Sequence, residues 1–370
     1  MNALSRVLRI VRPILGRHQN IRRSLVALDD RAAIARHALA QRLPWIIRPS
    51  PRQITIAITA ACNLRCQGCR YGRDFMVGEH LALPTVLQVL EDARDAGVAT
   101  ARFYGGEPML HKDLPQMIER TVALGMRPYI TSNGTLLEQR IEELYAAGLR
   151  TMTIGFYGVG DAYDGYTQRA GHFEKLRRGI EAVRRHCGSS FEIQINFMLS
   201  RHSCSMDSLQ AAWAFAREYD LFMGVDPVSK TIPFFQDPSG TLDLTEVHRV
   251  ELERVTAELV RLKREFPHRI PPSLPFLRAL PDLLLKDAAK DIPCDAYELL
   301  WVGADGSLQL CDVAFPLGNV KTTRLRELLF TETHCAAARD GFALKCPSCM
   351  CKIDSRIRRN GAVRAKYSGP

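Results

Sequence analysis

The sequence predicts an α/β protein in which parallel strands form a partial barrel and helices cover its outer face. Apolar segments of strand length alternate with helix-length segments six times, an alternation typical of parallel sheets. Three of the predicted helices are followed by Gly97, Gly125 and Gly148, where a left-handed residue is favoured. Pro84 and Asp113 stand at helix starts, the positions that favour these residue types.

The elements follow one another in a regular order along the chain. The strand candidates lie at 54–60, 100–104, 127–131, 151–156, 191–198 and 222–226. The helix candidates between them lie at 84–96, 113–125, 136–147, 172–187 and 206–219. In barrels of this type the chemistry lies at the carboxyl ends of the strands, so the residues that follow each strand are the first candidates for a site.

Segments outside the barrel divide the rest of the chain. We expect a basic amphipathic helical extension over 1–52, the barrel over 53–242, a helical connector over 243–290, a smaller module over 291–351 and a basic tail over 352–370. A long helical stretch from about 243 to 266 opens the connector, and prolines at 267, 271, 272 and 275 then interrupt regular structure.

Cys62, Cys66 and Cys69 form a C-x3-C-x2-C run directly after the first strand candidate. Three such thiolates can hold three irons of a [4Fe–4S] cube, a cluster that soft sulfur ligands suit. The run contains no fourth cysteine, so one iron is left open for a small molecule. The alternatives are weaker, because structural zinc normally takes four ligands, three cysteines cannot all pair as disulfides, and no secretory signal precedes them.

The run Gly105-Gly106-Glu107-Pro108 follows the second strand candidate. Two glycines let backbone carbonyls approach a ligand closely. With the cysteine run upstream, the chain resembles the radical S-adenosylmethionine (SAM) enzymes over residues 53 to 351. The resemblance implies a partial (β/α)6 TIM-like barrel, a [4Fe–4S] cluster on the three cysteines, SAM at its open iron, and binding of the SAM amino group by Gly105-Gly106-Glu107-Pro108.

Three further residues are candidates for contact with SAM. Ser132 begins a Ser-Asn-Gly segment after the third strand, and Asn196 lies in the fifth strand. Ser132 could equally be part of a turn, and Asn196 a satisfied polar group in the core. The family places an aromatic residue near the adenine just before the third cysteine, where this chain has Gly68, so Tyr71 is the substitute. Gly155 stands where many relatives carry a serine hydroxyl.

A second set of cysteines lies in the C-terminal module. Cys294 precedes a predicted hairpin over 299–310 that ends in Gly-x4-Cys311, and Cys346 and Cys349 form a CxxC pair. The pattern resembles the family's SPASM or shorter Twitch modules, a small β-hairpin and helix unit, and implies one auxiliary [4Fe–4S] cluster on Cys294, Cys311, Cys346 and Cys349. Cys351 is the alternative to Cys349 as the fourth ligand, and a four-cysteine zinc ribbon is the structural alternative to the iron–sulfur cluster. The isolated cysteines are expected to be small buried hydrophobes, namely Cys187, Cys204 and Cys335.

Composition limits the location of the protein. The chain has 370 residues with 46% hydrophobic content and eleven cysteines. No apolar run reaches the roughly 18 residues of a transmembrane helix, and no cleavable signal pattern is present. These features predict a cytoplasmic protein in a reducing interior, which oxygen-sensitive clusters also need.

The net charge of +10 is concentrated at the two ends. Residues 1–52 hold eleven Arg against two Asp, and 352–370 hold six Lys or Arg against one Asp. The N-terminal segment also carries an apolar stripe, comprising Leu4, Val7, Leu8, Val11, Ile14 and Leu15. This pattern suits peripheral contact with an anionic membrane at its inner face, and the alternative is a helix packed on the barrel with a solvated basic face. Nucleic-acid binding is not favoured, because no recognition motif accompanies the charge.

The resemblance implies the reaction class but not the substrate. The resemblance implies that SAM is cleaved reductively to methionine and a 5′-deoxyadenosyl radical, and that this radical abstracts hydrogen from the substrate. It also implies that the auxiliary cluster assists the redox chemistry. A reductase such as flavodoxin or ferredoxin is expected to supply the electrons. We expect a small-molecule substrate of sugar or metabolite type. The alternatives are a membrane-associated lipid or lipid-linked substrate and a ribosomally made peptide, for which residues 1–52 look too short to form a leader-binding domain. No catalytic acid or base is assigned, and Tyr157, Asp226 and Lys230 are candidates to face the substrate.

Overall fold

A single nine-stranded sheet organises the computed structural model, which describes residues 19–311 and 314–369. Its first six strands are parallel to their neighbours, and all six strand candidates are confirmed. These strands are β1 (Gln53–Thr59), β2 (Thr100–Gly105), β3 (Arg127–Ser132), β4 (Thr151–Phe156), β5 (Glu192–Leu199) and β6 (Phe222–Pro227). The N-terminal apolar stripe over residues 4–15 lies outside the described residues.

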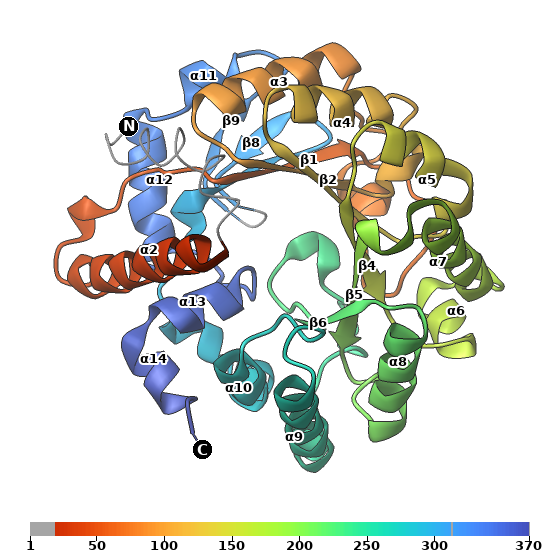
Figure 1. Cartoon of the computed structure of the whole chain (residues 1–370). Coiled ribbons are helices and arrows are strands. Elements are labelled where there is room, and N and C mark those ends of the chain that lie inside the picture. The colour runs from red at the N-terminus through yellow and green to blue at the C-terminus, as the bar shows by residue number, and fades with distance from the viewer. Residues whose placement is uncertain (1–18, 312–313, 370) are drawn as a thin grey trace.

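Helices cover the outer face of these strands, as Figure 1 shows. They are α3 (Leu83–Asp95), α4 (Leu114–Ala123), α5 (Leu137–Ala146), α6 (Asp161–Thr167), α7 (His172–Cys187) and α8 (Met206–Glu218). Five of them match the helix candidates. The sequence did not indicate α6, because seven residues with a central glycine carry too short a periodic pattern to detect.

The barrel strands are apolar outside and polar inside. Along β5 every second side chain is buried, whereas the residues between them are partly or fully exposed. The buried set faces the covering helices and consists of Ile193, Ile195, Phe197 and Leu199. The alternation follows from the two-residue period of a strand. The inner face is therefore a polar lumen at the centre of the partial barrel.

The C-terminal module continues the sheet of the barrel. Strand β7 (Leu299–Val302) pairs parallel with β1, and β8 (Ser307–Gln309) and β9 (Pro316–Asn319) follow in antiparallel order. The predicted hairpin is therefore present as β7 and β8. The sequence did not indicate its pairing with β1, because strand pairing between distant segments leaves no local pattern.

The connector contains two helices, α9 (Arg249–Glu265) and α10 (Leu274–Leu285). The sequence predicted only the first, because prolines crowd the start of the second. Pro275 is tolerated there because the first turn of a helix needs no donor at that position. Ser273 Oγ accepts a hydrogen bond from Phe276 N at 3.3 Å and caps the helix.

Helix α2 (Gln19–Ala40) and the helices of the last described residues pack against the C-terminal module. Helix α2 contacts α13, and the hydroxyl of Tyr297 lies 2.9 Å from His37 Nε2. The other helices here are α11 (Leu325–Leu328), α12 (Glu332–Phe342), α13 (Ile353–Arg359) and α14 (Gly361–Lys366). The segment expected as a basic tail is thus helical. Two of its cations, Arg356 and Arg359, are buried because they satisfy carbonyls and carboxylates of the module.

Candidate functional site

The loop after β1 carries the three cysteines of the C-x3-C-x2-C run. Gln67 N donates to Tyr166 O at 2.9 Å, which joins the loop to α6. Arg70 N donates to Phe234 O at 2.8 Å, which joins it to the turn that follows β6. The loop is therefore fixed from two sides by elements of the barrel.

The thiols of this loop form a donor set suited to an iron–sulfur cluster. Burial raises the pKa of Cys62 to about 11 and also raises the pKa of Cys66 and Cys69. Leu64 N donates to Cys62 Sγ at 3.4 Å. Without metal, the thiols stay protonated at neutral pH, and iron binds them by displacing the protons. The residues fit the [4Fe–4S] cluster that the resemblance implies.

The Gly105-Gly106 pair lies against the cysteine loop. Gly106 N donates to Thr59 O at 2.8 Å, and Glu107 N donates to Ala61 O at 2.7 Å. A Cβ on Gly105 would lie 2.1 Å from Thr59 O, and one on Gly106 would lie 2.2 Å from Ala61 O. Gly105 also has φ +130°, a conformation that L side chains rarely adopt. Any side chain here would push this turn away from the cysteines.

Glu107 joins the ends of β2 and β3. Its fully buried carboxylate accepts hydrogen bonds from Met109 N at 3.0 Å, Ser132 Oγ at 2.8 Å and Asn133 N at 2.8 Å. Burial raises the pKa of this carboxyl, although the three donors oppose the rise. Both carboxylate oxygens thus have partners within the protein. Glu107 and Ser132 brace the site in the structure, and their direct contact with SAM stays a prediction.

Asn133 extends this network to the cysteine loop. Its side-chain amide donates to Asn63 Oδ1 at 2.8 Å and lies 4.0 Å from Cys62 Sγ. Tyr163 Oη donates to the Asn133 carbonyl at 3.1 Å. The sequence marked only the turn that contains Asn133, because nothing local indicates a bond to a loop seventy residues earlier.

Asn196 and Asp226 lie side by side in the lumen. Asn196 Oδ1 accepts from Gln194 Nε2 at 2.7 Å, and the Asn196 side chain also bonds the carboxylate of Asp226. Asp226 is exposed at the end of β6. Desolvation by the surrounding barrel raises the pKa of its carboxyl, and the charge of Arg102 opposes the rise. This is an accessible carboxyl group on the inner face of the barrel.

Arg102 supplies the positive charge of the lumen. Its Nε donates to Thr131 Oγ1 at 2.9 Å. Its guanidinium carbon lies 4.7 Å from the ring centre of Tyr104 and 5.8 Å from that of Tyr129. Arg102 is not among the residues that the sequence predicts for the site. The signal that could have found it is a charged residue at an inward position of a barrel strand.

Two tyrosines take different places around the cysteine loop. Tyr71 is 1% exposed and its hydroxyl accepts from Ala304 N at 3.2 Å, so its burial favours a packing role over the expected adenine contact. Tyr157 stacks on Tyr166 with ring centres 4.1 Å apart. A Cβ on Gly155 would lie 2.6 Å from Tyr157 Oη, so this phenol occupies the space of the absent side chain.

Lys230, a candidate to face the substrate, instead connects two backbone segments. Its ammonium donates to Leu284 O at 3.1 Å and to Leu244 O at 3.5 Å. These bonds join the loop after β6 to the end of α10 and to the segment that precedes α9. The geometry gives this lysine a structural role.

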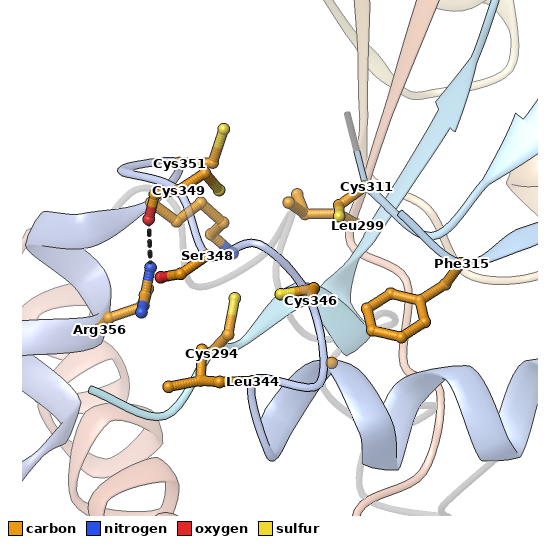
Figure 2. Close-up of a pocket in the computed structure, with 13 residues that line it drawn as sticks. Cys294, Leu299, Cys311, Phe315, Leu344, Cys346, Ser348, Cys349, Cys351 and Arg356 are labelled. Carbon is orange, nitrogen blue, oxygen red and sulfur yellow. Dashed lines mark hydrogen bonds between the residues drawn. The ribbon is translucent and has the colours of Figure 1, made fainter. Parts of the chain in front are cut away.

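Five cysteines of the C-terminal module line one cavity, shown in Figure 2. They are the four predicted auxiliary ligands, Cys294, Cys311, Cys346 and Cys349, together with Cys351. In this view the sulfurs of Cys294 and Cys346 turn toward the middle of the cavity, whereas that of Cys351 points away from them. Burial raises the pKa of Cys294 to about 12. Apolar side chains such as Leu299, Phe315 and Leu344 form part of the wall, and Ser348, Lys352 and Arg356 add polar groups to it.

Arg356 holds the cysteine segment in place from one side of this cavity. The side chain is fully buried. Its guanidinium donates to Cys349 O at 2.6 Å, to Ala289 O at 2.5 Å and to Ile292 O at 2.6 Å. Burial raises the pKa of Cys294, and the positive charge of Arg356 opposes this rise. The sequence does not indicate Arg356, because it stands among other basic residues in a segment whose composition is typical of a solvated tail.

The isolated cysteines stand apart from both sets. Cys187 and Cys204 are buried in the hydrophobic core, as expected. Cys335 is only partly buried on α12 and its thiol donates weakly to Phe330 O at 4.0 Å. None of these three lines the cavity of the auxiliary cysteines.

Comparison with known proteins matches part of the chain to a family. Residues 56–198 match the radical SAM superfamily. The AdoMet-dependent heme synthase of Methanosarcina barkeri is 26% identical over 298 residues, which cover 76% of this chain and 82% of that protein. The PqqA peptide cyclase of Xanthomonas euvesicatoria is 28% identical over 227 residues, 58% of this chain and 60% of the cyclase. The chain therefore spans less than two thirds of the cyclase.

Solved structures share the fold across both parts of the chain. SuiB of Streptococcus suis bound to its precursor peptide SuiA superposes with a TM-score of 0.62 at 15% identity, over 89% of this chain and 76% of SuiB. The enzyme anSMEcpe with bound AdoMet and a peptide gives a TM-score of 0.61 at 16% identity, over 79% of this chain and 83% of anSMEcpe. The predicted fold class is confirmed.

Proposed function

Because the chain is a radical SAM enzyme, with its matched domain at residues 56–198, we propose that it removes hydrogen from a peptide substrate held at the mouth of the barrel. The similarity to two PqqA peptide cyclases and the fold shared with peptide-bound SuiB support a peptide over the small molecule that the sequence favoured. The observation in the structure that carries the proposal is the accessible Asn196–Asp226 pair in the lumen.

The chain's own residues supply binding and orientation. Cys62, Cys66 and Cys69 hold the [4Fe–4S] cluster, and the Gly105-Gly106 turn offers backbone groups to SAM. The bound cluster and SAM supply the 5′-deoxyadenosyl radical. Through its three hydrogen bonds, Glu107 fixes the Gly105-Gly106 turn relative to the segment that begins at Ser132.

Asp226 is the proposed residue for substrate contact. Burial raises the pKa of Tyr166, and the charges of Cys66, Cys69 and Asp226 add to this rise, so these three groups lie around one tyrosine. A carboxylate there can accept a hydrogen bond from a peptide N–H or pair with a cationic side chain.

The C-terminal module holds the proposed auxiliary [4Fe–4S] cluster on Cys294, Cys311, Cys346 and Cys349. A four-cysteine zinc site is the alternative. Metal analysis of anaerobically purified and reconstituted protein separates them, since two cubes require about eight irons per chain and a zinc ribbon leaves about four.

Electrons come from a reductase partner such as flavodoxin or ferredoxin. The net charge of +10 supports this class, because acidic electron carriers are attracted to a basic protein. Reduction of the clusters by either carrier should slow as the salt concentration rises.

The direct test is anaerobic turnover with dithionite and SAM. The enzyme should form 5′-deoxyadenosine, and a panel of precursor peptides from neighbouring genes should yield a product that has lost hydrogen. Absence of 5′-deoxyadenosine with both clusters loaded would contradict the radical reaction. Release of 5′-deoxyadenosine with product formation from no peptide would contradict the peptide substrate.

A second candidate follows from the heme synthase of M. barkeri, which this chain matches over 82% of its length. Tetrapyrrole precursors of heme belong in the same substrate panel. Conversion of such a precursor, with peptides left unchanged, would restore the small-molecule substrate that the sequence favoured.

Peripheral contact with an anionic membrane through residues 1–52 is a separate proposal. Trp45 is 63% exposed and lies beside exposed Leu39, Leu43, Arg42 and Arg48. Aromatic and basic groups together suit a lipid surface. No helix among the described residues is long and apolar enough to cross a membrane. Sedimentation with anionic vesicles should weaken in Trp45→Ser, whereas Val247→Ser, which alters an exposed residue elsewhere, should bind as wild type.

A further inference from the structure

A small aromatic cluster lies between the two sets of cysteines. Its fully packed members are distinct from the main core and comprise Ala57, Ala60, Tyr71, Ile232, Phe234, Trp301 and Ala304. Cys69, the third cysteine of the first site, packs against this cluster. Cys349 and Cys351 of the C-terminal cavity pack against it as well. One unit of closely packed side chains therefore contacts both sites.

Three rings form the centre of this unit. Tyr71 and Phe234 meet edge to face with centres 5.3 Å apart. Phe234 and Trp301 are nearly parallel, with centres 6.0 Å apart and 16° between their planes. Tyr71 and Trp301 are 6.3 Å apart at 88°. Each ring thus contacts the other two, and no solvent layer separates them because Tyr71 and Trp301 are each 1% exposed.

The connection to the first site is also made through a hydrogen bond. The backbone N–H of Tyr71 donates to the thiol of Cys69. At the other side, Trp301 lies on β7, whose hairpin with β8 leads to Cys311. The three rings therefore join the first cysteine loop to the strand that carries the C-terminal module.

The environment of Trp301 suits electron transfer through the indole without loss of its N–H proton. Over the part of the chain that the structure describes, its buried indole N–H has no hydrogen-bond partner. An indole that loses an electron also tends to lose this proton, and here no acceptor receives it. The ring is therefore suited to couple two redox sites electronically while it stays reduced itself.

We propose that Tyr71, Phe234 and Trp301 form the path by which one electron passes between the auxiliary cluster and the SAM-binding cluster. The inference rests on the proposed function in one respect, namely that both cysteine sets hold clusters. One electron leaves the reduced auxiliary cluster and reduces the oxidised SAM-binding cluster; no bond changes and no proton moves. The path returns an electron taken from a substrate radical to the cluster that gave one to SAM.

The test follows intramolecular electron transfer in the loaded protein without any substrate. A flavin photoreductant delivers one electron, and rapid-freeze electron paramagnetic resonance records its redistribution between the clusters. SAM identifies the signal of the first cluster, because SAM binds only the cluster with an open iron. In Trp301→Leu and Phe234→Leu we expect a several-fold slower redistribution, with iron content and both reduction potentials unchanged. In Trp301→Phe, which keeps an aromatic ring, the rate of electron redistribution should lie between the rates of these two variants and that of wild type.

Trp213→Leu is the matched control, because Trp213 packs on Phe266, 5.1 Å between centres, outside this aromatic cluster. It should redistribute the electron at the wild-type rate. Wild-type rates in Trp301→Leu and Phe234→Leu with both clusters loaded would overturn the proposal, as would loss of iron in both variants, which would make the rings structural only. Peptide turnover is not measured, so failure here is distinct from failure of the proposed substrate.

Discussion

Ser132 Oγ donates a hydrogen bond of 2.8 Å to Glu107 Oε1, across the ends of two neighbouring parallel strands. Both residues belong to segments expected to bind SAM, yet the structure directs the carboxylate of one toward the hydroxyl of the other. The pair fixes the relative position of the two turns that face the cysteine loop. Binding of SAM is therefore expected to depend on Glu107 through geometry as well as through any direct contact.

Substitution of Glu107 tests this role. Glu107→Gln keeps one acceptor oxygen, whereas Glu107→Ala leaves three buried donors unpaired, and each unpaired group costs about 1–3 kcal/mol. We expect the free energy of unfolding to fall more in Glu107→Ala than in Glu107→Gln. Chemical denaturation measures stability and equilibrium dialysis measures SAM affinity. Equal stability of the two variants would contradict the bracing role.

The auxiliary ligands can be separated by serine substitutions. Cys349 and Cys351 line the same cavity, but the sulfur of Cys351 points away from those of Cys294 and Cys346. Cys349→Ser should therefore lose one cluster and hold about four irons, whereas Cys351→Ser should retain about eight. Iron and sulfide analysis with Mössbauer spectroscopy checks the result. The reverse pattern would make Cys351 the ligand.

Asp226 should control the substrate step and leave SAM cleavage intact. Asp226→Asn keeps the size and the contact with Asn196 but removes the charge. We expect product formation to fall by about 10- to 100-fold, within the range for loss of one positioned group, while uncoupled 5′-deoxyadenosine persists. Glu192→Gln, which changes an exposed carboxylate at the opposite end of β5, serves as the control. Unchanged product yield in Asp226→Asn would place the substrate elsewhere.

Acid should destabilise the junction between α2 and the C-terminal module. Burial lowers the pKa of His37 to about 4, although Asp295 and Glu298 oppose the change. In the unfolded chain the imidazole takes up a proton near pH 6.5. The contribution of neutral His37 to the free energy of unfolding is therefore fully present above pH 6.5 and is lost as the pH falls toward 4.

Protonation of His37 in the unfolded chain should lower the free energy of unfolding by about 2 kcal/mol between pH 7 and pH 5. Urea unfolding across that interval should show a steeper decline for wild type than for His37→Gln. His334→Gln is a useful comparison, because burial also lowers the pKa of His334 to about 4. Parallel declines in wild type and His37→Gln would show that His37 is not responsible.

The sequence predicted the parts of the site that depend on local order. Cysteine spacing, the Gly105-Gly106 turn and the six strands are each contained in a short stretch of chain. The inward position of Arg102 is visible in the strand pattern, but its bond to Thr131 on the next strand and the bond of Asn133 to Asn63 in the cysteine loop are not, because they join segments far apart in the sequence. The same limit explains Arg356, because two of its three carbonyl partners, Ala289 and Ile292, lie more than sixty residues earlier in the chain.

The adenine contact of Tyr71 stays a prediction, and the surroundings of this residue show a second limit. Tyr71 lies two residues after Cys69 in the sequence, and in the structure it also lies next to the cysteine loop. However, its ring turns inward because a larger apolar surface, provided by Phe234 and Trp301, is available there. A residue's position in the chain thus indicated the neighbourhood but not the direction of the side chain.

The parallel pairing of β7 with β1 makes the C-terminal module inseparable from the barrel. Truncation before residue 291 would remove β7, one of the two partners of β1, and leave the backbone groups of β1 open along one side. Such an unprotected edge recruits strands from other molecules. The shortened chain should therefore form oligomers or aggregates, so the two iron–sulfur sites are expected to mature, persist and be degraded as a single folding unit.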